Sequence, residues 1–210
     1  MCLEGLSNVF HAVEGGVALK QEDQGYDVHN RMEEVAVLVV KKVVEEDKSA
    51  CTCPRCQLDM EALVLNVLPP DYVVLENGAP VGKSLITSLD ILERELFHHA
   101  LAGAYRALDI VKSAPRHGDD VEISLRNYTE DMIVPTLQEI LKHRKTECTC
   151  SECLSRVMMY ALNDLKPKYT TTAKGDVYAR VDEIDARHLA KVYAALYGAF
   201  EHVEKDGCHL

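Results

Sequence analysis

The segment Cys51-Thr-Cys-Pro-Arg-Cys56 places three thiols within six residues, and it reappears as Cys148-Thr-Cys-Ser-Glu-Cys153. The displacement is 97 residues (148 − 51), and the flanking sequence repeats at the same displacement without a gap. The chain is therefore a tandem duplication in which each copy contains a cluster of three thiols. Flanking pairs that match in this way include Asn30 and Asn127, Glu33 and Glu130, Asn66 and Asn163, and Tyr72 and Tyr169.

The length of 210 residues accommodates two compact domains of about 80–100 residues each. We predict an N-terminal extension with a short helix (1–29), a first repeat (30–112), a linker (113–126) and a second repeat (127–210). The net charge of −11 disfavours general binding to nucleic acids or anionic membranes, which require a basic surface. We therefore expect no nucleic-acid or membrane partner.

The first residues, Met1-Cys-Leu-Glu-Gly-Leu6, lack the basic and apolar regions of a secretory signal. No apolar run approaches the roughly 18 residues that a membrane-spanning helix needs. These features predict a cytoplasmic protein. In a reducing compartment, the eight cysteines are expected to bind metal or to perform redox chemistry rather than to form a disulfide framework.

Each repeat is expected to begin with a helix, because Asn30-x-x-Glu33 and Asn127-x-x-Glu130 both match a capping box before an apolar run. The valine-rich run of the first copy could also form a strand by propensity. The second copy has apolar residues at helical spacing among charged neighbours, which indicates a helix in both.

A second helix follows the third cysteine of each motif, and Pro69-Pro70 and Pro167 are expected to end these helices. The segment that starts at Tyr72 predicts a small β-hairpin with its turn at Asn77-Gly78. A long helix should begin near Ser84. We thus predict a mainly α fold with small β-hairpins, a tandem repeat of a helix–Cys loop–helix–hairpin–long helix unit.

The three thiolates of each motif favour a structural zinc site, because tetrahedral Zn²⁺ requires one further soft or borderline ligand. Cys208, at the end of the second long helix, can complete the second site, but the aligned residue of the first copy is Val111. The first site must therefore take Cys2, with His11 and His29 as alternatives. It also remains open which of Cys2 and Cys208 completes which site. We expect two zinc ions per chain, held by Cys2, Cys51, Cys53, Cys56, Cys148, Cys150, Cys153 and Cys208.

Other chemistry has weaker support. The cysteines could instead be reduced thiols that pack as small apolar groups, or the embedded CxxC could be redox-active, although no βαβ context surrounds it. The segment Gly78 to Ser84 is one residue short of a phosphate loop, so a hairpin return is expected there. Lys83 and the aligned Arg180 could contact an anionic ligand or remain surface charges, and His98-His99 is expected to be packed or exposed. Because no nucleophile–base pair is evident, we expect no enzymatic activity.

The first copy combines Cys51-Thr-Cys-Pro-Arg-Cys-Gln-Leu-Asp59 with Leu65-Asn66, Leu68-Pro69-Pro70 and Tyr72-Val73. This pattern resembles the ComFB family of bacterial late-competence proteins, and the two copies cover about residues 30–112 and 127–208. The second copy departs from the pattern, with Arg156 in place of Asp59 and Lys166 in place of the first proline.

The resemblance implies a small helical zinc-binding module that is able to form dimers, so the tandem chain could fold as an internal pseudo-dimer or form a homo-oligomer. Asp59 and Arg156 could then pair across the pseudo-twofold axis. The resemblance also implies a non-enzymatic regulatory or interaction role in bacterial competence, motility or second-messenger signalling. The alternatives are a receptor for cyclic di-GMP or cyclic di-AMP and a thiol-redox protein. The sequence does not indicate a protein partner.

Overall fold

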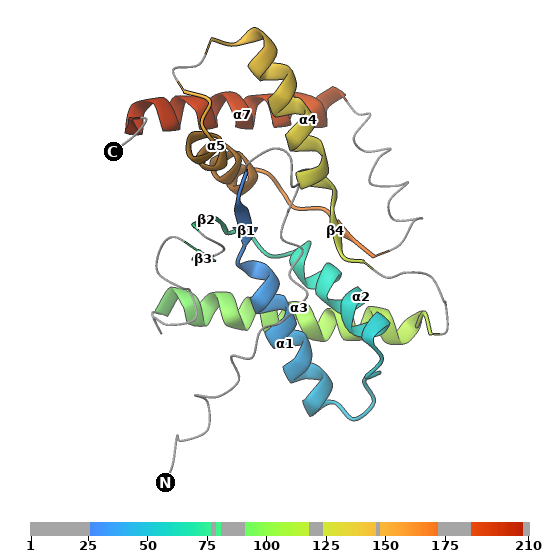
Figure 1. Cartoon of the computed structure of the whole chain (residues 1–210). Coiled ribbons are helices and arrows are strands. Elements are labelled where there is room, and N and C mark those ends of the chain that lie inside the picture. The colour runs from blue at the N-terminus through green and yellow to red at the C-terminus, as the bar shows by residue number, and fades with distance from the viewer. Residues whose placement is uncertain are drawn as a thin grey trace.

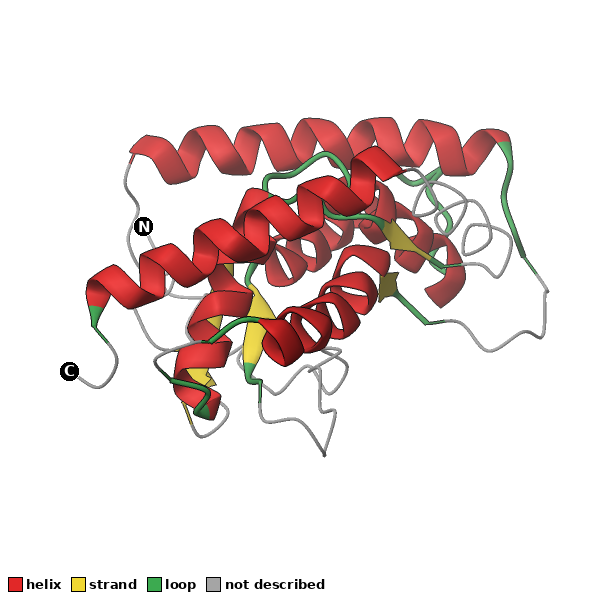
Figure 2. Cartoon of the chain, turned by 90° about the horizontal axis from the view of Figure 1, so that it is seen from above, coloured by secondary structure: helices red, strands yellow, loops and turns green. Residues whose placement is uncertain are grey.

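The computed structural model describes residues 26–76, 79–80, 91–117, 124–145, 148–171 and 186–207. The predicted mainly α fold and its tandem repeat are confirmed, since each repeat contributes three described helices (Figures 1 and 2). The expected N-terminal helix and most of the second hairpin lie outside the described residues. The helices are α1 (Met32–Glu46), α2 (Pro54–Leu65), α3 (Ile91–Ser113), α4 (Tyr128–His143), α5 (Ser151–Asp164) and α7 (Ala186–Asp206).

The described strands are short and antiparallel. Strand β2 (Tyr72–Glu76) pairs with β3 (Ala79–Pro80), which confirms the strand pairing of the predicted first hairpin. The opposite edge of β2 pairs with β1 (Val28–Asn30), a strand that the sequence analysis did not predict. The second repeat forms the same ladder between β4 (Arg126–Asn127) and β5 (Tyr169–Thr170).

The two ladders have the same register. Asn30 lies opposite Tyr72 in the first repeat, and Asn127 lies opposite Tyr169 in the second. Both asparagines also accept a backbone N–H at the start of the following helix, Asn30 from Met32 and Asn127 from Thr129. The predicted helix cap is confirmed for Asn127, which is the N-cap of α4. In α1 the N-cap position is Arg31, one residue after Asn30, and its side chain makes no capping bond. The predicted capping box is wrong for the glutamates. Their carboxylates turn toward the tyrosines instead.

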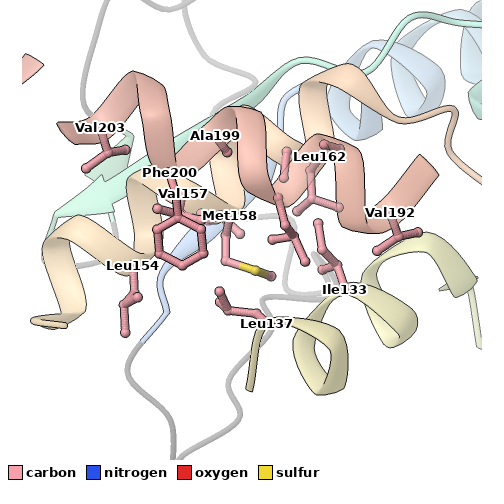
Figure 3. Packing of buried hydrophobic residues seen from close by; sticks show 14 of the residues in the cluster. Ile133, Leu137, Leu154, Val157, Met158, Leu162, Val192, Ala199, Phe200 and Val203 are labelled. Carbon is pink, nitrogen blue, oxygen red and sulfur yellow. The ribbon is translucent and has the colours of Figure 1, made fainter. Parts of the chain in front are cut away.

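The strands are exchanged between the two helical units. Tyr72 is 3% exposed and packs in the core formed by α4, α5 and α7, whereas Tyr169 is 6% exposed and packs in the core of α1, α2 and α3. Figure 1 shows the two groups of helices in separate halves, with β1 and β2 between them. Figure 3 shows the second core, where Leu137, Met158 and Phe200 come together from α4, α5 and α7.

Polar contacts at this exchange are reciprocal. The Asn66 side chain accepts the backbone N–H of Tyr169 at 2.6 Å and donates to its carbonyl at 2.8 Å. Asn163 holds the backbone of Tyr72 in the same way, at 2.7 and 3.0 Å. Because every buried backbone group needs a hydrogen-bond partner, these asparagines fix each strand on the opposite repeat.

The chain therefore folds as an internal pseudo-dimer. The predicted pairing of Asp59 with Arg156 across the pseudo-twofold axis is wrong, because each residue forms an ion pair within its own repeat. Asp59 binds Arg116, and Arg156 binds Asp206. Among the described helices, none is both long and apolar enough to cross a membrane.

Candidate metal centres

The cysteine loops are held in shape by the helices that follow them. Cys53 is the N-cap of α2 and its sulfur accepts the backbone N–H of Cys56, while Cys150 caps α5 and accepts from Cys153. Pro54 begins α2, where its missing N–H and fixed φ are tolerated. The first sulfur of each motif accepts one more N–H, from Cys53 to Cys51 and from Cys150 to Cys148, both at 3.4 Å.

The first cluster contains Cys51, Cys53, Cys56 and His117. The Nδ1 atom of His117 lies 3.6 Å from each of the three sulfur atoms. A neutral imidazole nitrogen carries either one proton or one lone pair, so it cannot form three equal hydrogen bonds. The four atoms instead surround a common point and could hold a metal ion there.

The thiols of the two clusters differ in pKa because their surroundings differ. The backbone N–H of Cys56 lowers the pKa of Cys53 to about 6, and the N–H of Cys153 likewise lowers the pKa of Cys150. Burial raises the pKa of the Cys56 thiol to about 12. A bound dication would outweigh these differences, because coordination deprotonates a thiol outright.

The second cluster contains Cys148, Cys150 and Cys153, whose sulfur atoms also lie within 4.8 Å of one another. Helix α7 ends at Asp206, which binds Arg156, three residues after Cys153. Gly207 follows the helix with a φ of +80°, and its carbonyl accepts from Arg156 on α5 at 3.4 Å. The next residue, Cys208, lies outside the described residues. Neither cluster forms a disulfide among its described cysteines.

The structure thus brings together six of the eight predicted ligands in two groups of three. The other two, Cys2 and Cys208, lie outside the described residues, as does His11. The alternative ligand His29 is not among the residues that gather in either group, and its Nε2 binds Glu34 at 2.5 Å. At the fourth position of the first cluster, where the sequence analysis expects Cys2, the structure places His117.

His117 is not predicted from the sequence, because the residue that aligns with Cys208 at the displacement of 97 residues is Val111. His117 lies in the segment that we predicted to be a linker. A usable signal was nevertheless present: His117 follows the end of α3 at Ser113, as Cys208 follows the end of α7 at Asp206. Position relative to the helix end, rather than the alignment, relates the two residues.

Fold and site together define a tandem helical protein with two cysteine clusters that could each hold a metal ion. The sequence profile of one family, described as late competence development protein ComFB, matches residues 29–115 and 126–207. The chain belongs to this family, and it carries two copies of the family's domain. Searches of curated proteins and of solved structures find no match.

Proposed function

We propose that this chain is a non-enzymatic regulatory or interaction protein of bacterial competence or signalling, and that two structural zinc ions stabilise it. The family supports the regulatory role. The metal role rests above all on the position of His117 Nδ1, which is 3.6 Å from all three cysteine sulfurs. The need for reduced thiols fits a cytoplasmic protein.

The observed distances match tetrahedral zinc. With Zn–S bonds of about 2.3 Å and a Zn–N bond of about 2.0–2.1 Å, a tetrahedral ion separates sulfur from nitrogen by about 3.5–3.6 Å. The donor set, three thiolates and one imidazole, is also one that zinc prefers in structural sites. Cys208 would complete the second site as a set of four thiolates.

Such sites have a structural role. Four protein ligands fill the tetrahedron and leave no position for substrate or water, whereas catalytic zinc keeps one position open. The ion in the first cluster would join the loop before α2 to the segment after α3. The ion would therefore stabilise the contact between these two segments without taking part in a reaction.

Thiol titration tests this proposal against the redox alternative. If zinc holds the cysteines, a thiol reagent should react slowly with the native protein and rapidly after chelation, and chelation should also lower the melting temperature. Immediate reaction of all thiols in the untreated protein, with no effect of the chelator, would exclude the structural zinc and favour redox-active cysteines.

A groove favours a second candidate function, that of a cyclic-dinucleotide receptor. It has a volume of about 620 Å³ and is lined by the equivalent loops 66–70 and 163–167. Arg106, His99 and Lys166 contribute basic groups, which are suited to phosphates despite the acidic chain. Isothermal calorimetry with cyclic di-GMP and cyclic di-AMP tests it. Binding that is lost in Arg106→Gln would support the receptor, and no heat at high micromolar ligand would exclude it.

A further inference from the structure

The residue three positions after the last cysteine of each motif has opposite charge in the two repeats: it is Asp59 in the first and Arg156 in the second. Both side chains nevertheless contact the same region of their repeats, namely the end of the long helix and the residues that follow it. Asp59 binds Arg116, and Arg156 binds Asp206. The substitution in the second repeat therefore reverses an ion pair and does not remove it.

The first clamp consists of Asp59, Arg116 and Thr171. The Nε of Arg116 donates to Asp59 at 2.9 Å, and its Nη2 donates to the second oxygen of the same carboxylate. The Thr171 hydroxyl accepts from Arg116 at 2.7 Å and donates to Asp59 at 2.5 Å. The Asp59 side chain is only 8% exposed, so the surrounding structure fixes the carboxylate, and Arg116 directly precedes His117.

The second clamp consists of Arg156, Asp206 and Gly207. Arg156 donates to the Asp206 carboxylate at 2.9 Å and to the Gly207 carbonyl at 3.4 Å. The Tyr160 hydroxyl donates to the same carboxylate at 3.1 Å. The second clamp therefore holds the chain up to the residue before Cys208, just as the first clamp holds it up to the residue before His117.

From these contacts we infer that the first clamp positions His117, the fourth ligand of the first metal centre, with Asp59 as the positioning residue on α2. The second clamp makes the corresponding contact from α5, up to Gly207. This inference rests on the proposed metal-binding function. What the two repeats share is the geometry of the contact, a charged pair between the cysteine helix and the residues before the ligand. The sign of the charge is interchangeable because neither clamp residue touches the metal.

Positioning matters here because His117 is exposed and follows the end of α3 without being part of the helix. Without the clamp, metal binding would have to immobilise this segment at a cost in conformational entropy. Residues that orient metal ligands typically contribute 10–100-fold to metal affinity. Thr171 adds a link between the repeats, since it directly follows the exchanged strand β5 of the second repeat and binds Asp59 and Arg116 of the first.

The test uses the full chain loaded with Co²⁺, whose absorption reports the ligand set, and measures metal release to a chelator. We expect Asp59→Asn to release one equivalent about 10–100-fold faster, with a spectral change that indicates weakened nitrogen ligation. The second equivalent should keep the wild-type rate. Arg116→Gln should act in the same way. Because Arg116 is the more exposed residue of the pair, this variant tests the clamp even if Asp59→Asn disturbs folding.

The most informative variant gives the first clamp the charge order of the second. Asp59→Arg combined with Arg116→Asp should restore a rate of metal release close to that of the wild type. Arg31→Gln, which breaks a comparable ion pair with Asp71 away from the cysteines, is the control and should release both ions at wild-type rates. The inference would be overturned if Asp59→Asn and Arg116→Gln both released metal at the wild-type rate. It would also be overturned if the double variant with the reversed ion pair released metal as fast as the single variants. Failure of the wild-type chain to bind any Co²⁺ would instead refute the proposed metal function.

Discussion

Tyr72 and Tyr169 occupy equivalent positions in the two repeats, and each is buried in the core of the other repeat. The Tyr72 hydroxyl donates to Glu130, and the Tyr169 hydroxyl donates to Glu33 at 2.8 Å. Each hydroxyl also accepts from an asparagine, Asn127 for Tyr72 and Asn30 for Tyr169. Because each core contains a tyrosine of the other repeat, the two repeats should unfold as one unit.

Substitution of Asn66 tests how much the exchange of strands between the repeats contributes to stability. Asn66→Ala removes two hydrogen bonds to the backbone of Tyr169, a residue that is 6% exposed. We expect it to lower the free energy of unfolding by about 1–3 kcal/mol, and Asn163→Ala should have a similar effect through Tyr72. Urea unfolding with zinc present measures both. A loss confined to one repeat, seen as two separate transitions, would contradict a cooperative exchange.

The exchange also predicts the behaviour of a single repeat. A fragment of residues 26–117 lacks β5 and the Tyr169 side chain that completes its core. It should form a homodimer, because the equivalent Tyr72 of a second copy can occupy the same place. Sedimentation at several concentrations measures this, and a folded fragment that stays monomeric would show that the exchange is dispensable.

Glu130 should make stability depend on pH. Burial raises its pKa from 4.5 to about 7. An acid whose pKa is raised on folding stabilises the folded state at low pH, and this contribution is lost as pH rises through the folded pKa. Between about pH 4.5 and about 7, the wild type should therefore lose stability relative to Glu130→Gln, which stays neutral.

Urea unfolding of the zinc-loaded proteins across this range measures the difference. Glu139→Gln is the matched control on the same helix, because the Glu139 carboxylate is exposed and Lys142 lowers its pKa. Parallel stability curves for the wild type and Glu130→Gln would show that the buried carboxyl does not titrate in this range.

His117→Ala should weaken one metal site and spare the other. Loss of a direct ligand should reduce affinity by more than the roughly 10–100-fold typical of outer-shell changes. His143→Ala, which removes a histidine whose side chain is 77% exposed on α4, should leave both sites intact. Competition with a chromophoric chelator measures the two affinities, and equal affinities in His117→Ala and wild type would exclude His117 as a ligand.

The sequence predicts the helices well because the duplication supplies two versions of each pattern. Capping asparagines, proline stops and apolar spacing are local signals, and they agree between copies. The thiol clusters are also local, since the three cysteines lie within six residues. The first hairpin could be placed because its turn residues are adjacent in the chain.

The exchange of strands between the repeats and the fourth ligand of the first cluster could not be predicted in this way. Both depend on contacts between segments that lie far apart in the sequence. Glu33 matches a local capping box, yet its carboxylate binds Tyr169 from the other repeat. Asp59 and Arg156 have complementary charges, but each binds a partner at or just after the end of the long helix of its own repeat. His117 has no counterpart at the same register, so the duplication that clarified the helices concealed it.

Native mass spectrometry of the intact, tag-free chain measures its metal content and so tests the two structural zinc sites. We expect two zinc ions per chain, with one of them lost on mild chelation in His117→Ala. A chain that carries no zinc while it keeps its native helical content would contradict the structural role assigned to the two cysteine clusters.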